Sequence, residues 1–260
     1  MSAAASASTR RLAIAMAPVL AVALALVAIE VVARQGGLPM FLPSPSAVWK
    51  AYSARPALLW ENLWVSGWKA MLGFGIAIGL ALAAAAVGVM AERVREPIYR
   101  AGVFIQAVPL IALTPLLVVW FGNTAKTHVI IAALSSYFPM LVAGMQGFRA
   151  AEPARIELMS VLSASPWQTF VNLQVPTALP YLFAGLKIAA PLAVLGIITA
   201  EWTGADRGIG AMMLYALFSY NVPTVWLSVV AACGLSVSFF AVAALAERFA
   251  ITWEPAGTTA

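Results

Sequence analysis

The chain has 260 residues, of which 63% are hydrophobic and only 10% are charged, whereas about a quarter of the residues of a soluble domain carry charge. The apolar residues fall in long blocks, so the lipid bilayer is the predicted solvent and one membrane domain is the predicted organisation. The net charge of +5 comes from basic residues scattered between those blocks, a distribution that argues against a nucleic-acid partner.

Six apolar blocks are long enough to cross a bilayer. Because unpaired backbone groups are costly in lipid, each block is predicted to be a helix, which gives an all-α integral membrane fold. The first block exceeds the core of a cleaved signal peptide, so we predict an uncleaved span. The six blocks are Leu12–Val32, Val65–Ala91, Ile98–Trp120, His128–Phe148, Ala178–Ala200 and Thr224–Phe249.

Two connectors are longer than turns. Residues 35–64 begin as Pro-rich extended chain and continue as a predicted short surface helix. The segment "EWTGADRGIGAMMLYALFSYNVP" contains a glycine-rich turn and an apolar stretch too short to cross, which is predicted to re-enter the bundle. The predicted division is a tail and first span at 1–34, the connector at 35–64, a core at 65–250 with cytoplasmic helices at 153–176, and a short tail at 251–260.

The basic residues also predict an orientation. With the N-terminus inside the cell, eight basic residues lie on the cytoplasmic side and five on the outer side, if Lys69 and Lys187 within the spans are not counted. This bias favours a multi-pass protein with both termini in the cytoplasm. The connector between the fourth and fifth spans then faces the cytoplasm.

That connector, "ELMSVLSASPWQTFVNLQVP", has the pattern of two short helices rather than a loop. Leu158, Met159 and Leu162 share one helical side, which predicts a short amphipathic helix lying on something apolar. Ser165 is a predicted N-cap, with Pro166 at the first helical position and Gln168 completing a capping box. The segment is either an interfacial helix pair resting on the membrane or a docking device for a partner protein.

The same connector resembles the cytoplasmic loop of ABC importer permeases, whose pattern is E-A-A, three residues, G, nine residues, I-x-L-P. Glu157 takes the acidic position, Leu158 and Met159 replace the alanines, and Ser163 replaces the glycine. The closing positions of the pattern are Leu173, Val175 and Pro176.

Three further stretches resemble permeases of the nitrate, sulfonate, taurine and bicarbonate type. They are "LPSPSAVWKAY", "VPLIALTPLLVVWFGNTAKTHVIIAALSSYFPML" and "AEWTGADRGIGAMM". The likeness covers nearly everything after about residue 35, in order. It implies the six-span permease fold of type I ABC importers, the MetI-like fold, in a bacterial inner membrane.

The resemblance also implies partners. The chain has no G-x-x-x-x-G-K-[ST] phosphate loop, so ATP hydrolysis must come from a separate cytoplasmic ATPase, which the connector helices are expected to contact. The resemblance further implies a periplasmic or lipid-anchored substrate-binding protein and a second permease copy, with the pathway between the copies. Glu157, Leu158, Met159, Ser163, Ser165, Pro166, Leu173 and Pro176 are the expected ATPase-coupling residues.

A second group of residues is expected at the gate or the translocation pathway: Pro109, Pro115, Lys187, Glu201, Gly208 and Gly210. Glycines at 208 and 210 permit tight turns, and the two prolines either shape the cavity or merely kink the third span. Lys187 is interpreted as a substrate-attracting charge, an inter-helix partner or an interfacial anchor. Glu201 is interpreted as a gate residue or an interfacial anchor.

Other functions fit the sequence less well. A secondary transporter usually carries an intramembrane carboxylate or an inverted repeat, and a membrane enzyme needs more than the single His, Asp and Cys of this chain. We therefore predict no enzyme activity, no cofactor and no metal site. The expected cargo is a small solute, either an anion such as a sulfonate, nitrate or taurine, or a pyrimidine-type vitamin precursor.

Overall fold

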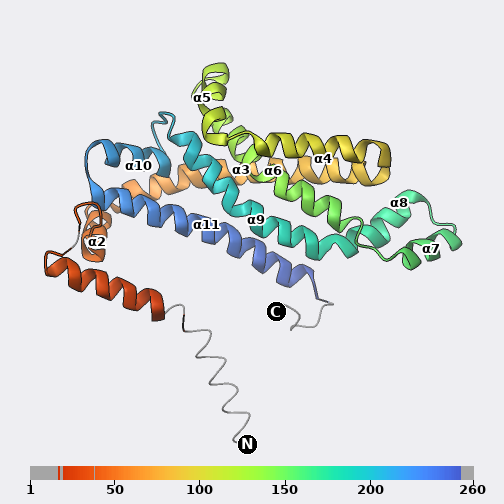
Figure 1. Cartoon of the computed structure of the whole chain (residues 1–260), viewed down its shortest axis with the longest axis horizontal. Helices are drawn as coiled ribbons and strands as arrows, with labels where there is room; N and C mark the ends of the chain where they lie inside the picture. Colours follow the sequence, from red (N-terminus) through yellow and green to blue (C-terminus); the bar gives the residue numbers. More distant parts are fainter. Residues whose placement is uncertain (1–16, 18–19, 38, 253–260) are drawn as a thin grey trace, which may run out of the picture.

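The computed structural model describes residues 17, 20–37 and 39–252. All regular structure in these residues is helical (Figure 1). Residues 20–34 are helical and precede the labelled elements. The labelled helices are α2 (Pro45–Ala54), α3 (Pro56–Met90), α4 (Glu92–Ala107), α5 (Leu110–Phe121), α6 (Ala125–Gly147), α7 (Pro153–Val161), α8 (Pro166–Thr169), the π-helical turn η1 (Phe170–Gln174), α9 (Val175–Glu201), α10 (Ile209–Phe218) and α11 (Val222–Ala250).

Four long helices, α3, α6, α9 and α11, form the bundle (Figure 1). α6 packs against both α3 and α9, and α9 also packs against α11. Small residues allow the close α6–α9 contact: a Cβ added to Gly147 would lie 3.0 Å from the Cβ atoms of Ala178 and Tyr181. The cores on both sides of α9 are apolar, so the bundle is held by packing of small and branched side chains.

The same four helices are long and apolar enough to cross a membrane. They confirm the second, fourth, fifth and sixth predicted spans, although α3 begins at Pro56, ahead of the predicted Val65. The helix at 20–34 covers the end of the first predicted span, whose beginning lies outside the described residues, as do Arg10 and Arg11.

The third predicted span is not one helix. α4 and α5 are separate helices bent by 92°. The break has a local cause, because a proline disfavours the helical conformation of the residue before it, and Val108, before Pro109, is extended with φ −73° and ψ 121°. The sequence indicated a bend at Pro109, but the structure shows a corner that turns α5 away from α4. Pro115 lies inside α5.

Both long connectors contain the predicted short helices. In α2, Ser44 is the N-cap and accepts a hydrogen bond from the Ala47 backbone N–H. α10 packs against α3, α9 and α11 and buries residues of its first turn, which confirms that this apolar stretch returns to the bundle. Gly75 and Gly79 on α3 make no close contact with another described helix, since a Cβ at either would meet nothing within 4 Å.

The connector between α6 and α9 projects from one end of the bundle (Figure 1). We call this the α7/α8 end, and the opposite end, which carries α2 and α10, the α2/α10 end. The predicted capping box is present, with Ser165 and Gln168 exchanging side-chain and backbone hydrogen bonds. α8, η1 and α9 then continue as one helical segment from Pro166 to Glu201.

Candidate functional site

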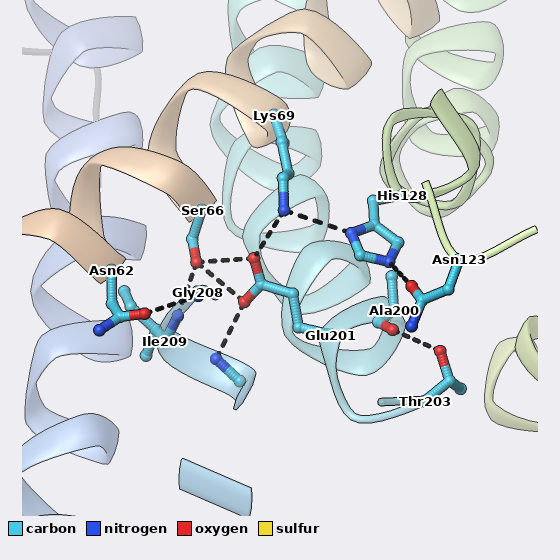
Figure 2. A network of polar contacts seen from close by, with 11 residues as sticks. Asn62, Ser66, Lys69, Asn123, His128, Ala200, Glu201, Thr203, Gly208 and Ile209 are labelled. Atoms are coloured by element: carbon cyan, nitrogen blue, oxygen red, sulfur yellow. Dashed lines mark hydrogen bonds and ion pairs between the residues drawn. The ribbon is translucent and has the colours of Figure 1, made fainter. Parts of the chain in front are cut away.

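A buried carboxylate organises the α2/α10 end of the bundle (Figure 2). Glu201, the last residue of α9, is fully buried. The Ser66 hydroxyl on α3 lies 2.9 and 2.8 Å from the two carboxylate oxygens, and the Gly210 backbone N–H donates to Oε2 at 2.9 Å. The ammonium of Lys69, also on α3, lies 3.6 Å from Oε1. These contacts supply the hydrogen bonds and the counter-charge that a buried carboxylate requires.

Three consecutive backbone amides at the start of α10 are satisfied by side chains from other helices. The Gly208 N–H donates to Asn62 Oδ1 at 2.7 Å, and the Ile209 N–H donates to Ser66 Oγ at 2.8 Å. The third amide is that of Gly210, bound to Glu201. The first amides of a helix have no partner within it, so α3 and α9 together cap α10.

The two predicted glycines are required by this arrangement. Gly208 has φ +131°, a conformation that side chains disfavour, and a Cβ there would overlap the Glu201 carboxyl group. A Cβ at Gly210 would lie 2.7 Å from the Ile198 carbonyl oxygen and 2.8 Å from Glu201 Cβ. The backbone of this turn therefore approaches the carboxylate at a distance that only glycine permits.

His128 on α6 extends the site. Its Nδ1 lies 3.3 Å from Lys69 Nζ, and its Nε2 lies 2.7 Å from Asn123 Oδ1. An ammonium group only donates hydrogen bonds, so Nδ1 accepts from Lys69 and the Nε2–H donates to Asn123, which makes the imidazole neutral. We call the whole set the Glu201 network: Asn62, Ser66, Lys69, Asn123, His128, Glu201, Gly208, Ile209 and Gly210.

The network brings together residues that lie far apart along the chain. Glu201, Gly208 and Gly210 were predicted together, whereas the roles of Asn62, Ser66 and Lys69 were missed. The sequence does contain a signal for them, because residues 62, 66 and 69 are polar and share one face of a largely apolar helix. In the part of the chain that the structure describes, no group of three His, Cys, Asp or Glu side chains is arranged to hold a metal ion.

A cleft with several charged residues in its lining lies beside the network at the same end of the bundle. It has a volume of about 840 Å³ and is bordered by α2, α3, α10 and α11. Its charged lining consists of Lys50, Arg55, Glu61, Asp206 and Arg207. The cleft therefore presents charges of both signs at the surface.

The other predicted pathway residues lie apart from the network. Lys187 on α9 donates to both carboxylate oxygens of Glu247 on α11, at 3.0 and 2.8 Å. It is thus an inter-helix partner, one of its three interpretations, and Glu247 was not anticipated. Pro109 and Pro115 lie at the start of α5 and within it.

The predicted coupling residues lie together along the opposite, α7/α8 end. Glu157, Leu158 and Met159 are on α7, Ser163 is in the turn after it, Ser165 and Pro166 begin α8, Leu173 is in η1 and Pro176 is in the first turn of α9. Within the described residues no other part of the chain covers the apolar stripe of α7, so a membrane surface or a partner protein as its contact stays a prediction. Leu158 is 57% exposed and Leu162 67% exposed.

Ser163, at the glycine position of the motif, has a backbone conformation that favours glycine. Its φ is +57°, in the left-handed region where glycine is favoured. The Ala164 N–H donates to the Met159 carbonyl and the Ser163 N–H donates to the Ser160 carbonyl, which is the hydrogen-bond pattern of a Schellman motif. The turn between α7 and α8 thus forms this motif without glycine.

Comparison with known proteins gives a consistent set of matches. The family model described as "binding-protein-dependent transport system inner membrane component" matches residues 75–250. A formylaminopyrimidine transport permease protein of Halalkalibacterium halodurans is 32% identical over 246 residues, covering 92% of this chain and 96% of the relative.

Two relatives from Escherichia coli K12 are named as transporters of other solutes. A putative aliphatic sulfonates transport permease protein is 28% identical over 218 residues, covering 83% of this chain and 82% of the relative. A taurine transport system permease protein is 29% identical over 188 residues, covering 67% of this chain and 66% of the relative.

Proposed function

Because this chain belongs to the family of inner-membrane components of binding-protein-dependent transport systems, we propose that its α7/α8 end docks on a cytoplasmic ATPase. The family membership makes the chain a permease component of an ABC importer for a small solute. The assignment of its two ends, its copy number and its cargo is our proposal.

One observation carries the docking proposal. α7 buries none of its residues. Its exposed residues include the apolar Leu158 and Val161, and the apolar Leu162 just after it is exposed as well. Local hydrogen bonds at Ser165 and Ser163 fix the angle between α7 and α8. An exposed apolar surface on a fixed projection is typical of a protein contact, and α8 continues directly into α9.

Substitution on α7 tests this proposal. Leu158→Glu and Val161→Glu place charge in the proposed contact, and we expect the ATPase to be lost when the complex is purified through the permease. Val94→Glu, at an exposed position on α4, is the matched control and should keep the ATPase. Retention of the ATPase by both α7 variants would contradict the proposal.

The same preparation distinguishes the alternative, a secondary transporter. Vesicles that contain the permease alone should not take up solute, whereas vesicles that contain the complete complex should do so only with ATP. Uptake by the permease without any ATPase would favour the alternative.

The opposite end is proposed to receive the substrate-binding protein, with both termini of the chain in the cytoplasm. The charged cleft beside α10 offers cations and carboxylates at a surface, and such charges favour a complementary partner and fast association. We expect Lys50→Glu with Arg55→Glu to weaken binding of the loaded binding protein, and Lys126→Glu, outside the cleft, to leave it unchanged.

Two copies of the chain are proposed to enclose the pathway. α5 turns away from α4 and exposes Ile111, Val119 and Trp120, an apolar surface that a second copy would cover. After Cys233→Ser, which removes the single cysteine, a Val119→Cys variant should cross-link copy to copy in membranes. Cross-linking equal to that of the exposed Val237→Cys control on α11 would argue against this interface.

The Glu201 network is proposed to hold the outer gate. It fastens the start of α10 to α3 and α9, so α10 can change position only if these contacts change. A cysteine at Asp206, which is exposed, would report a change in distance between copies when nucleotide binds. A cross-linking yield independent of nucleotide would count against the gate.

The cargo is proposed to be a small anion, such as a sulfonate or taurine, or a pyrimidine-type vitamin precursor, on the basis of the relatives' names. Lys187 does not support an anion, because Glu247 neutralises its charge. Mass spectrometry of the ligand carried by the binding protein from the same transport system would decide between these classes.

A further inference from the structure

A chain of three aromatic rings leads from the surface of α8 into the bundle. The Trp167 and Phe170 rings are stacked with centroids 5.8 Å apart, and the Phe170 and Phe148 rings meet edge to face at 5.0 Å. Trp167 is 60% exposed, whereas Phe170 and Phe148 are buried. The chain therefore begins where a docked partner would lie and ends at the last turn of α6.

The backbone beneath this chain of rings is not a regular α-helix. η1 is a π-helical turn between two α-helical segments, and such turns occur mostly as single interruptions of α-helices, frequently at functional sites. A force applied to α8 would reach α9 through this wider turn if the backbone were the only connection. The aromatic contact at Phe170 provides a second connection, made by side chains rather than by the backbone.

The helices that would receive this force, α6 and α9, form a tightly packed pair. Close contacts join α6 and α9 at Gly147 and again at Gly185, where an added Cβ would overlap Ala143. Phe148 and Phe170 belong to the same buried cluster as Ala178 and Leu182 of α9. Because these surfaces interlock along much of their length, α6 and α9 should move together and carry any displacement to Glu201 at the far end.

We propose that Phe170 and Phe148 are positioning residues that transmit movement of the docked α8 to the α6–α9 pair. This inference rests on the proposed docking of α7 and α8 on an ATPase. It goes beyond that docking, because neither buried ring can touch a partner protein. Trp167 is the exposed end of the chain, and its stacking sets the position of Phe170.

The test uses the complete complex in proteoliposomes, with the binding protein purified together with its own ligand. Phe170→Leu and Phe148→Leu remove the ring contacts while keeping apolar side chains. Phe183→Leu is the matched control, since Phe183 is a buried phenylalanine of α9 outside the aromatic chain. The readouts are the amount of ATPase bound and the stimulation of ATP hydrolysis by the loaded binding protein.

We expect Phe170→Leu and Phe148→Leu to bind wild-type amounts of ATPase and to lose stimulation at least tenfold, while Phe183→Leu keeps it. Trp167→Phe, which preserves a stacked ring, should retain stimulation that Trp167→Ala loses. Normal stimulation in Phe170→Leu, or an equal loss in Phe183→Leu, would overturn the inference. Failure of the wild-type permease to bind any ATPase would instead refute the proposed docking.

Discussion

The buried pair of Lys69 and Glu201 gives the sharpest stability prediction. The ammonium is within 3.6 Å of the carboxylate, and the two side chains are 8% and 0% exposed. Replacing Glu201 by Gln removes the negative charge and leaves Lys69 buried without a counter-charge. Breaking a buried pair in this way costs about 3–5 kcal/mol, and we take the lower end because Gln keeps the shape and part of the hydrogen bonding.

A loss of about 3 kcal/mol corresponds to a fall of roughly 6–12 °C in the midpoint of thermal unfolding for a chain of this size. Lys69→Met removes the other charge and keeps the apolar part of the side chain. The double variant Lys69→Met with Glu201→Gln contains neither charge, so we expect it to cost about 2 kcal/mol less than the sum of the single variants. Tryptophan fluorescence of the detergent-solubilised permease provides the measurement.

The chain contains its own control for this cycle. Lys187 and Glu247 also join two helices at 2.8 Å, but each side chain is 27% exposed. Because Glu247 lies in the last turn of α11, we expect water to reach and screen this pair, so the corresponding cycle with Lys187→Met and Glu247→Gln should give a coupling energy of under about 1 kcal/mol. Equal coupling in both cycles, or additive effects at Lys69 and Glu201, would refute the reasoning.

Three further predictions concern the backbone. Ser163→Gly should raise the midpoint of thermal unfolding, since a left-handed conformation costs a non-glycine residue about 1–2 kcal/mol. The control Ser160→Gly, inside α7, should lower the midpoint. An unchanged midpoint in both variants would contradict this prediction. Ser165→Ala removes the N-cap of α8 and should cost about 1 kcal/mol, measurable as faster proteolysis of the connector than in the wild-type permease. Gly208→Ala should destabilise the permease far more than Gly204→Ala. Both glycines have positive φ, but only at 208 would a Cβ overlap the Glu201 carboxyl group. A comparison of the unfolding midpoints of the two variants tests this prediction.

The features that were predicted correctly from the sequence are local ones. The capping box at Ser165 and Gln168 depends on residues three apart, so the pattern alone specifies it. The lengths of α6, α9 and α11 follow from apolar runs that must satisfy their own backbone hydrogen bonds in lipid. The corner at Pro109 was partly predictable, because the proline restricts Val108, but the 92° angle is set by how α5 packs on α6 and α9.

The partners of Glu201 were not predictable from local pattern. Ser66 is 135 residues away along the chain, and no periodicity in either helix specifies that the two faces meet. The same holds for Lys187 and Glu247, which lie 60 residues apart. Such pairs emerge only from the packing of α3, α9 and α11, and packing is decided by the shapes of many small residues together.

The capping of α10 by side chains of other helices has a consequence for biogenesis. The amides of Gly208, Ile209 and Gly210 find their acceptors on Asn62, Ser66 and Glu201, so the first turn of α10 cannot be completed until α3 and α9 have met in the membrane. During synthesis, α10 leaves the ribosome after α3 and α9. Formation of its first turn therefore depends on the correct pairing of those two helices.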